Sequence, residues 1–524
     1  MDTAKRLLVP LVVALLTATM STPAAADPLD PLGALVKVIP LPTLPFGPTD
    51  IDPTTLVVTD DELAGAGQLL PSLSETEPQP TSGVVALAVD RGLPLAMASG
   101  LVGLAAGLVS PLVAAVVVGI ASRTVTSGAT LVVDDDLVQC PGATFTTIGA
   151  AVAAANPGDT IQVCSGTYLE SVVVPSTKPG LIIQAVPAQD LTTSCKGPTP
   201  PSVNPAQQSI VQSSTSSAGI FNVQADNVVI DGFIIQANTA GPGISTAASG
   251  SGYQIRNNLI QNNQPNGLVL NSSGTSPTNV KHNCFRQSPA APPNFTGPAQ
   301  HRGIQSGAVT GGVDGLKNVT IENNHFTGEP EASISVFASG AGTQSQISIT
   351  HNSIIGDQSI EFVSVSGGLI QNNLISQPGG TAIVLAGVTS IEVSLNKLLG
   401  GAGNGIAVLG NFRANTNLTV NKNKATGFAM SGIKLDGPAG GTSVTLNKSE
   451  GNTFDGIRAE ATSSGYVIDK NGMKSNGDVD CLDASGPGGP GTAGTANTWT
   501  NDKGDTQNFD PNIRGSICKK ASGP

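Results

Sequence analysis

Cationic, acidic and imidazole side chains recur in the middle of this sequence at intervals that would stack them on one another. Arg256, Lys281 and Glu322 stand two residues before successive copies of a repeated Asn, and His282 and His351 stand one residue before it. In stacked coils, neighbouring members of such a column lie within about 5–10 Å along the stack. Arg256 and Lys281 would hold the carboxylate of an acidic sugar, and His282, His351 or Glu322 would move a proton. The alternative interpretation is a solvated charged face with incidental histidines.

The longest interval between copies of the repeated Asn lies in the same region. Asn283 and Asn324 stand 41 positions apart, and this interval contains His301 and Arg302. The excess, around residues 287–300, is expected to form a loop over the charged face, because binding residues often lie on long loops that a rigid scaffold positions. We therefore add His301 and Arg302 to the predicted substrate-binding residues.

The repeated Asn belongs to a sequence motif. Val or Ile is followed by two residues of any type, then by Asn or Asp, then by one further residue and an apolar residue. A repeat of about 20–40 residues is typical of a solenoid. The Asn or Asp of the ten copies is Asp231, Asn258, Asn283, Asn324, Asn352, Asn373, Asn396, Asn423, Asn447 and Asn471.

A second phrase, Gly followed by Ile or Leu, alternates with the first, as at Gly405–Ile406 and Gly432–Ile433. Apolar and polar residues alternate around it, which is the period of a half-buried strand. At least two strands per repeat, joined by turns, make one coil of a β-helix. We expect the repeated Asn to occupy the sharp turn, where it tolerates the left-handed conformation, and to hydrogen-bond along the stack. Its predicted role is structural.

Composition narrows the class of protein and its compartment. A net charge of −12 argues against a nucleic-acid partner, and 3% aromatic residues argue against a conventional large core. Residues 1–26 fit a secretory signal peptide, with Lys5 and Arg6 before an apolar stretch and cleavage after Ala26. The mature protein is therefore expected to be secreted or held at the cell surface.

Six cysteines, an even number, suit an exported protein. Cys140 and Cys164 bracket the expected start of the solenoid, and Cys481 and Cys518 bracket its end. These pairings leave Cys195 with Cys284.

Two segments precede the expected solenoid. Residues 27–82 are rich in Pro and fit a linker, whereas residues 83–123 are expected to form an apolar helical segment. Residues 95–121 are apolar enough to associate with a membrane. A true span would return the solenoid to the cytoplasm, where disulfides do not persist. The alternative is a helix, broken by Pro94 and Pro111, that packs against protein.

The beginning and the end of the solenoid carry a family resemblance. Residues 140–148 (CPGATFTTI), 157–163 (PGDTIQV) and 166–170 (GTYLE) resemble the opening of secreted right-handed parallel β-helix proteins of the pectin-lyase-like superfamily. The ending, with 480–482 (DCL) and 496–499 (ANTW), matches the same family. The resemblance implies an all-β, right-handed parallel β-helix of about a dozen coils over residues 130–520, with an N-terminal capping helix at 145–155.

The resemblance implies work on polysaccharides but supplies no catalytic residue. Segment 166–170 is similar to part of pectin methylesterases, yet their later Asp-Phe-x-Phe-Gly is absent, as are the acidic motifs of polygalacturonases and the Asp-Pro-His of alginate epimerases. The sequence therefore favours a surface protein that binds polysaccharide without catalysis. The alternative is a lyase or hydrolase acting on an acidic, uronate-containing glycan. Asp478, Asp480 and Asp483 could bind Ca²⁺, but no loop of defined ligand spacing supports that. A structural role is preferred there, and no other cofactor is predicted.

Overall fold

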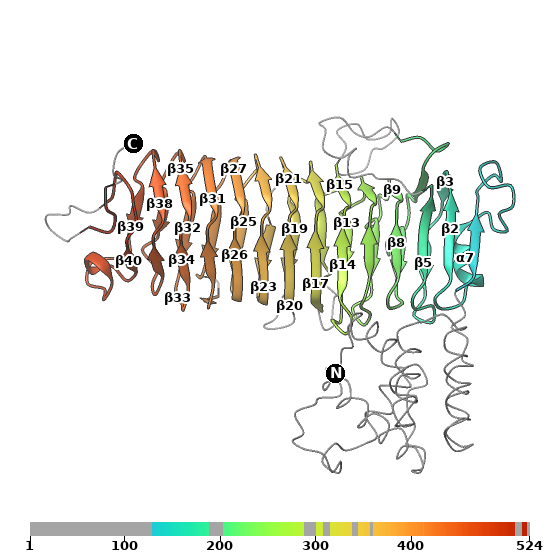
Figure 1. The fold of residues 1–524 in the computed structure, drawn as a ribbon, viewed down its shortest axis with the longest axis horizontal. Helices are drawn as coiled ribbons and strands as arrows, with labels where there is room; N and C mark the ends of the chain where they lie inside the picture. Colours follow the sequence, from blue (N-terminus) through green and yellow to red (C-terminus); the bar gives the residue numbers. More distant parts are fainter. Residues whose placement is uncertain are drawn as a thin grey trace, which may run out of the picture. The chain divides into compact units, whose positions relative to one another are not determined.

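Strands stack in parallel to form a β-solenoid with three sheets, here named A, B and C (Figure 1). The computed structural model describes residues 128–187, 203–287, 300–307, 315–337, 344–356, 360–411, 413–508 and 516–520. The coils supply strands to the sheets in the order A, B, C, and each strand pairs in parallel with its equivalents in the neighbouring coils. Two coils add a second, two-residue strand to sheet A. Sheets B and C each hold 12 strands, or about 11 turns, close to the predicted dozen coils.

Sheet A consists of β1 (Thr130–Val133), β2 (Thr160–Cys164), β5 (Ile182–Val186), β8 (Val229–Asp231), β11 (Gln254–Arg256), β14 (Thr278–Lys281), β17 (Leu316–Glu322), β20 (Gln344–Thr350), β23 (Val365–Gln371), β26 (Thr389–Ser394), β29 (Asn415–Thr416), β30 (Thr419–Asn421), β33 (Ala439–Gly440), β34 (Ser443–Thr445), β37 (Val467–Asp469) and β40 (Thr498–Thr500). Sheet B consists of β3 (Gly166–Leu169), β6 (Ser209–Gln212), β9 (Ile234–Gln236), β12 (Leu259–Gln261), β15 (Cys284–Arg286), β18 (His325–Thr327), β21 (Ser353–Ile355), β24 (Leu374–Ser376), β27 (Lys397–Gly401), β31 (Lys424–Phe428), β35 (Lys448–Glu450) and β38 (Gly472–Lys474). Sheet C consists of β4 (Val172–Val174), β7 (Phe221–Val223), β10 (Ile244–Thr246), β13 (Asn266–Leu270), β16 (Arg302–Ser306), β19 (Ala332–Phe337), β22 (Ile360–Val363), β25 (Ile383–Ala386), β28 (Ile406–Leu409), β32 (Ile433–Asp436), β36 (Ile457–Ala459) and β39 (Cys481–Asp483).

The core is a set of apolar columns running along the solenoid. Ile255, Val280, Ile321, Ile349 and Ile370 stack in register in sheet A, and each is at most 1% exposed. Burying one such side chain contributes about 1.5–3 kcal/mol. Because every coil repeats this contact, the thin coils need few aromatic residues to form a continuous core.

Each repeat contains three strands rather than the minimum of two expected from the sequence. β11 ends at Arg256 and β12 begins at Leu259, so only Asn257 and Asn258 separate sheet A from sheet B. Because this corner is so short, the repeated motif around the Asn contains both the end of the sheet A strand and the start of the sheet B strand.

The predicted role of the repeated Asn in hydrogen bonding along the stack is confirmed. Asn373 Oδ1 accepts bonds from the backbone N and Nδ2 of Asn352, at 2.9 and 3.0 Å. Asn373 Nδ2 donates to the carbonyl of Ile349 and to Asn396 Oδ1. The asparagine ladder contains Asn258, Asn283, Asn324, Asn352, Asn373, Asn396, Asn423, Asn447 and Asn471.

The expected backbone conformation of the ladder asparagines is wrong. The residue with positive φ is the one before each of them, as in His282, His351 and Leu395, whose φ values are 56°, 56° and 58°. The left-handed residue points its side chain outward at the corner, so the buried Asn follows it in ordinary conformation. The asparagines are needed at the corner for their amide groups rather than for their tolerance of positive φ.

Asn373→Ala is expected to lower the free energy of unfolding by about 3 kcal/mol, because it removes the buried acceptor of the Asn352 backbone N and the buried donor to the Ile349 carbonyl. The measurement is a denaturant unfolding curve. Gln371→Ala, which removes an outward side chain bonded to Ser394, is the matched control and should change stability by less than about 0.5 kcal/mol. Equal losses in the two variants would contradict the structural weight given to the ladder.

The first predicted copy of the repeat is out of register by two residues. Asp231 pairs with Arg256 and not with Asn258. Phe233 holds the ladder position in that coil, where its backbone N donates to Asn258 Oδ1 at 3.0 Å. Asp231 therefore joins the outward column of sheet A, and the asparagine ladder begins at Asn258.

The capping helix is confirmed as α7 (Ile148–Ala154), shorter than the predicted 145–155. Thr147 caps it by accepting a bond from the backbone of Ala150. The Glu170 carboxylate accepts bonds from the first two amides of the helix, at Ile148 and Gly149, as expected for an anion at a helix N-terminus. Glu170 thus has a structural role at the N-terminus of α7.

Both ends of the solenoid are closed by the predicted disulfides, Cys140–Cys164 and Cys481–Cys518. Cys284 is also disulfide-bonded, and its predicted partner Cys195 lies outside the described residues. These bonds are typical of proteins outside the reducing cytoplasm.

The predicted signal peptide, Pro-rich linker and apolar segment, at 1–26, 27–82 and 83–123, lie outside the described residues. Within the described part of the chain, every helix is too short or too polar to cross a bilayer.

Candidate functional site

The predicted charged column exists on sheet A. Arg256, Lys281 and Glu322 stand opposite one another in register at the ends of β11, β14 and β17. Arg256 is held by Asp231 of the preceding coil, with Nε 2.8 Å from the carboxylate. Lys281 and Glu322 form no ion pair within the described residues. The column is therefore a partly compensated charged face.

His282 and His351 lie at the corner between sheets A and B as the exposed, left-handed residues described above. Neither imidazole forms a hydrogen bond within the described residues, so no carboxylate there orients either ring. The left-handed backbone conformation at this corner accounts for the presence of a histidine there. Their imidazoles also lack the hydrogen-bonded partner that orients a general base.

His301 and Arg302 lie on a different edge of the solenoid. Arg302 begins β16, so both residues stand where sheet B turns into sheet C, and the ends of the long 287–300 connection lie at this same turn. The structure therefore places His301 and Arg302 apart from the column of Arg256 and Lys281, with sheet B between the two edges.

Glu331, from the next coil, joins the two side chains into one cluster. Its Oε1 lies 2.7 Å from His301 Nδ1, and its Oε2 lies 2.5 Å from an Arg302 amino nitrogen. The backbone N of Glu331 also donates to the His301 carbonyl at 3.0 Å. We call these three residues the histidine cluster. Glu331 stands 30 positions after His301, and no motif in the sequence marks it as a site residue.

The geometry of the histidine cluster defines what its imidazole can do. Because a carboxylate only accepts hydrogen bonds, the proton of a neutral His301 sits on Nδ1, facing Glu331. Nε2 then keeps its lone pair. The His301 side chain is 35% exposed and that of Arg302 is 30% exposed. The cluster thus combines an oriented base with a neighbouring cation on an accessible rim.

A polar layer supports the histidine cluster from inside the turn. Gln300 is fully buried, and its side chain bonds the backbone of Asn263 and the carboxylate of Glu329. Burial lowers the pKa of nearby Arg286, and the charge of Glu329 opposes that shift. These contacts fix the backbone immediately before His301.

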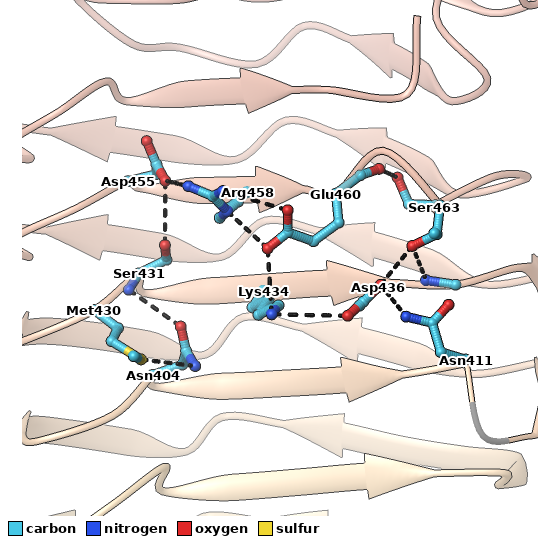
Figure 2. Close-up of polar contacts among 12 residues, drawn as sticks. Asn404, Asn411, Met430, Ser431, Lys434, Asp436, Asp455, Arg458, Glu460 and Ser463 are labelled. Atoms are coloured by element: carbon cyan, nitrogen blue, oxygen red, sulfur yellow. Dashed lines mark hydrogen bonds and ion pairs between the residues drawn. The ribbon is translucent and has the colours of Figure 1, made fainter.

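A second charged cluster lies on sheet C toward the C-terminal end (Figure 2). Arg458 bonds Glu460 through Nε at 2.8 Å and Asp455 through Nη1 at 3.1 Å. Lys434 lies 3.2 Å from Glu460 and 3.7 Å from Asp436. Lys434 and Arg458 occupy equivalent positions in neighbouring repeats, and each is followed two residues later by a carboxylate, Asp436 or Glu460. This spacing in the sequence indicates the same two ion pairs. We call these five residues the arginine cluster.

The pKa values of the two carboxylates bound to Arg458 are shifted in opposite directions. Burial raises the pKa of Asp455, which is fully buried and also accepts a bond from Ser431. Burial would likewise raise the pKa of Glu460, but hydrogen bonds from Arg458 and Lys434 hold it below its usual range. Opposed pKa shifts of this kind also occur in catalytic acid pairs. Asp455, however, has no exposed surface to meet a substrate.

Both clusters lie along one edge of sheet C. The strand register places Arg302 and Asp455 at the same position, six coils apart, which is roughly 30 Å. Beside Asp455, Met430 and Phe454 are 43% and 40% exposed and lie in adjacent coils, where the backbone N of Phe454 donates to the Met430 carbonyl. The outer face of sheet C therefore combines ion pairs with exposed apolar surface.

Two of the three acidic residues considered for Ca²⁺ near the C-terminus, Asp480 and Asp483, bond to protein donors. Asp483 accepts the indole N–H of Trp499 at 2.7 Å and an amide N–H of Asn497. Asp480 accepts from Asn476 and from the backbone of Asp505. These contacts close the last coil, which supports the structural role expected there.

A family model described as a right-handed β-helix region matches residues 300–449 and again residues 360–486. A DFA-IIIase from Arthrobacter chlorophenolicus A6 is 14% identical, with 64% of this chain and 93% of that chain covered and a TM-score of 0.44. An alginate lyase from Paenibacillus sp. is 14% identical over 67% and 97%, with a TM-score of 0.35. The A-module of a mannuronan C-5 epimerase from Azotobacter vinelandii is 14% identical over 68% and 81%, with a TM-score of 0.30. The search of curated proteins found no match.

Proposed function

This chain contains a right-handed β-helix region, and we propose that it uses the outer face of sheet C to cleave an acidic, uronate-containing polysaccharide. The observation on which this proposal rests is the histidine cluster, in which Glu331 binds the Nδ1 side of His301 and also Arg302. A base held by a carboxylate and set beside a cation is what proton abstraction next to a carboxyl group requires.

The favoured reaction is elimination, as in a polysaccharide lyase. His301 Nε2 takes the proton from the carbon beside the uronate carboxyl, and Arg302 faces the charge that develops there. The electron pair of the broken C–H bond forms a carbon–carbon double bond, and the glycosidic C–O bond at the next carbon breaks. Water supplies the proton to the departing oxygen.

Recognition without turnover is the second candidate function. It is favoured by the arginine cluster, whose charged groups are paired with one another, and by the exposed Met430 and Phe454 beside it. Apolar side chains can pack on the C–H faces of sugar rings while Lys434 and Glu460 bond to hydroxyls. In either case the protein is proposed to act outside the cell, as its disulfides support.

A panel of glycans tests both functions with the full chain. Polygalacturonate, alginate and a neutral glucan are each assayed for binding, for unsaturated ends and for new reducing ends. Elimination predicts unsaturated ends from an acidic glycan and none from the glucan. Binding without product would replace the lyase by the recognition function, and absence of both would refute the two proposals together.

A further inference from the structure

A row of lysines follows the asparagine ladder on the outer face of sheet B. Lys397, Lys424 and Lys448 begin β27, β31 and β35 and stand opposite one another in register. The register continues through Gly472 to Lys503 and Lys519. We call the five lysines of this column the lysine row, which is interrupted once, at Gly472. All five are exposed.

The spacing of the row is set by the ladder. Lys397, Lys424 and Lys448 each directly follow a ladder asparagine, and Lys503 follows Asp502. The buried ladder fixes successive coils at about 4.8 Å, so the ammonium groups project from a rigid backbone at a regular interval. The sequence shows this signal as recurring Asn-Lys pairs.

Such a row is unfavourable by itself, because like charges directly opposite on neighbouring strands repel. Lys424 is paired with Glu450 at 3.2 Å. In the described part of the chain, Lys397, Lys448, Lys503 and Lys519 make no ion pair. A line of cations on a chain of net charge −12 therefore has the charge pattern of a surface that binds an extended anion.

We propose that the lysine row binds a linear acidic polysaccharide lying along the solenoid axis, at a site on sheet B separate from the proposed cleavage site on sheet C. The choice of a polysaccharide among anionic polymers rests on the proposed function. The residues at the adjoining corner support it, since Leu395 and Leu446 are exposed there and alternate with Lys422 and Lys470. Single-stranded nucleic acids instead need aromatic side chains for stacking, and this corner presents aliphatic ones.

Gly472 permits a gain-of-binding test. A β-carbon at Gly472 would meet no atom within 4 Å, and its φ is not positive. Gly472→Lys completes the row and is expected to tighten binding of polygalacturonate about fivefold at low salt, the effect of one Lys near an anionic surface. Gly472→Gln is the matched control and should not tighten it. Binding is measured by titration at low and high ionic strength, with dextran as the neutral glycan.

Charge reversal provides the loss-of-binding arm. Lys448→Glu should weaken polygalacturonate binding by at least about fivefold, whereas Lys317→Glu, on sheet A, changes net charge equally and should not. Equal effects of the two reversals, or no gain from Gly472→Lys, would overturn the proposal. Tighter binding of single-stranded DNA than of polygalacturonate would overturn the choice of partner. Unsaturated products from a protein whose polygalacturonate binding is unaffected by salt, by Lys448→Glu and by Gly472→Lys would refute this site alone, while salt-sensitive binding without product would refute only the cleavage reaction.

Discussion

His301→Ala is expected to lower kcat for cleavage of an acidic glycan by about 10²–10⁴-fold, the usual contribution of a positioned general base. The substitution removes the imidazole whose Nδ1 lies 2.7 Å from Glu331, while the backbone bonds of residue 301 to Pro265 and Glu331 remain. The measurement is the initial rate of unsaturated product, with binding measured in parallel. KM should change little, since His301 acts on the proton and Arg302 on the carboxylate.

Two further substitutions sharpen this test. Glu331→Gln keeps the size of the side chain but removes the charge that holds both His301 and Arg302, so kcat should fall by a smaller factor. His351→Ala is the control, because His351 is an exposed corner residue with no oriented partner. Loss of activity with His351→Ala or His282→Ala, and not with His301→Ala, would return the site to the sheet A column.

Asp502→Asn is expected to raise the free energy of unfolding by about 4 kcal/mol at pH 8 and by much less at pH 4. Asp502 ends the asparagine ladder, and its Oδ1 accepts two bonds from Asn471, each of 2.8 Å. Its Oδ2 is buried and forms no hydrogen bond within the described residues. Burial raises the pKa of Asp502 to about 7, and the charge of Asp469 adds to the shift.

The sign of the pH dependence follows from the raised pKa. Folded Asp502 holds its proton to a higher pH than unfolded Asp502 does, so the wild-type protein loses stability as pH rises from about 4 to about 7. An asparagine cannot ionise, and its Nδ2 would face the Ile468 carbonyl, the position equivalent to the acceptor used by every other ladder asparagine. Unfolding curves at the two pH values measure the effect. Asp505→Asn, an exposed carboxyl in the same coil, should show no comparable gain, and a pH-independent gain from Asp502→Asn would contradict the proposed cause.

Much of the fold could be predicted because each coil repeats the same physical problem. An apolar residue must point inward at fixed positions and a buried amide must bond the next coil, so Ile349 and Asn373 recur as types in the sequence. The stacking of Arg256, Lys281 and Glu322 was predictable for the same reason. The misplacement of Asp231 shows the limit of pattern matching, since Asp fits the phrase while strand pairing puts Phe233 at the ladder.

The sequence alone determined the stacked coils, the right-handed β-helix, the capping helix and the disulfides at both ends. Those features depend on local periodicity and on residues near each other along the chain. Only the tertiary structure decided that His301 and Arg302 meet Glu331 rather than Arg256. That contact joins coils across a connection of irregular length, so no repeat spacing predicts it. Which side chains share an edge depends on where the chain turns from one sheet to the next. Those turns become known only when the three sheets of the solenoid are placed in space.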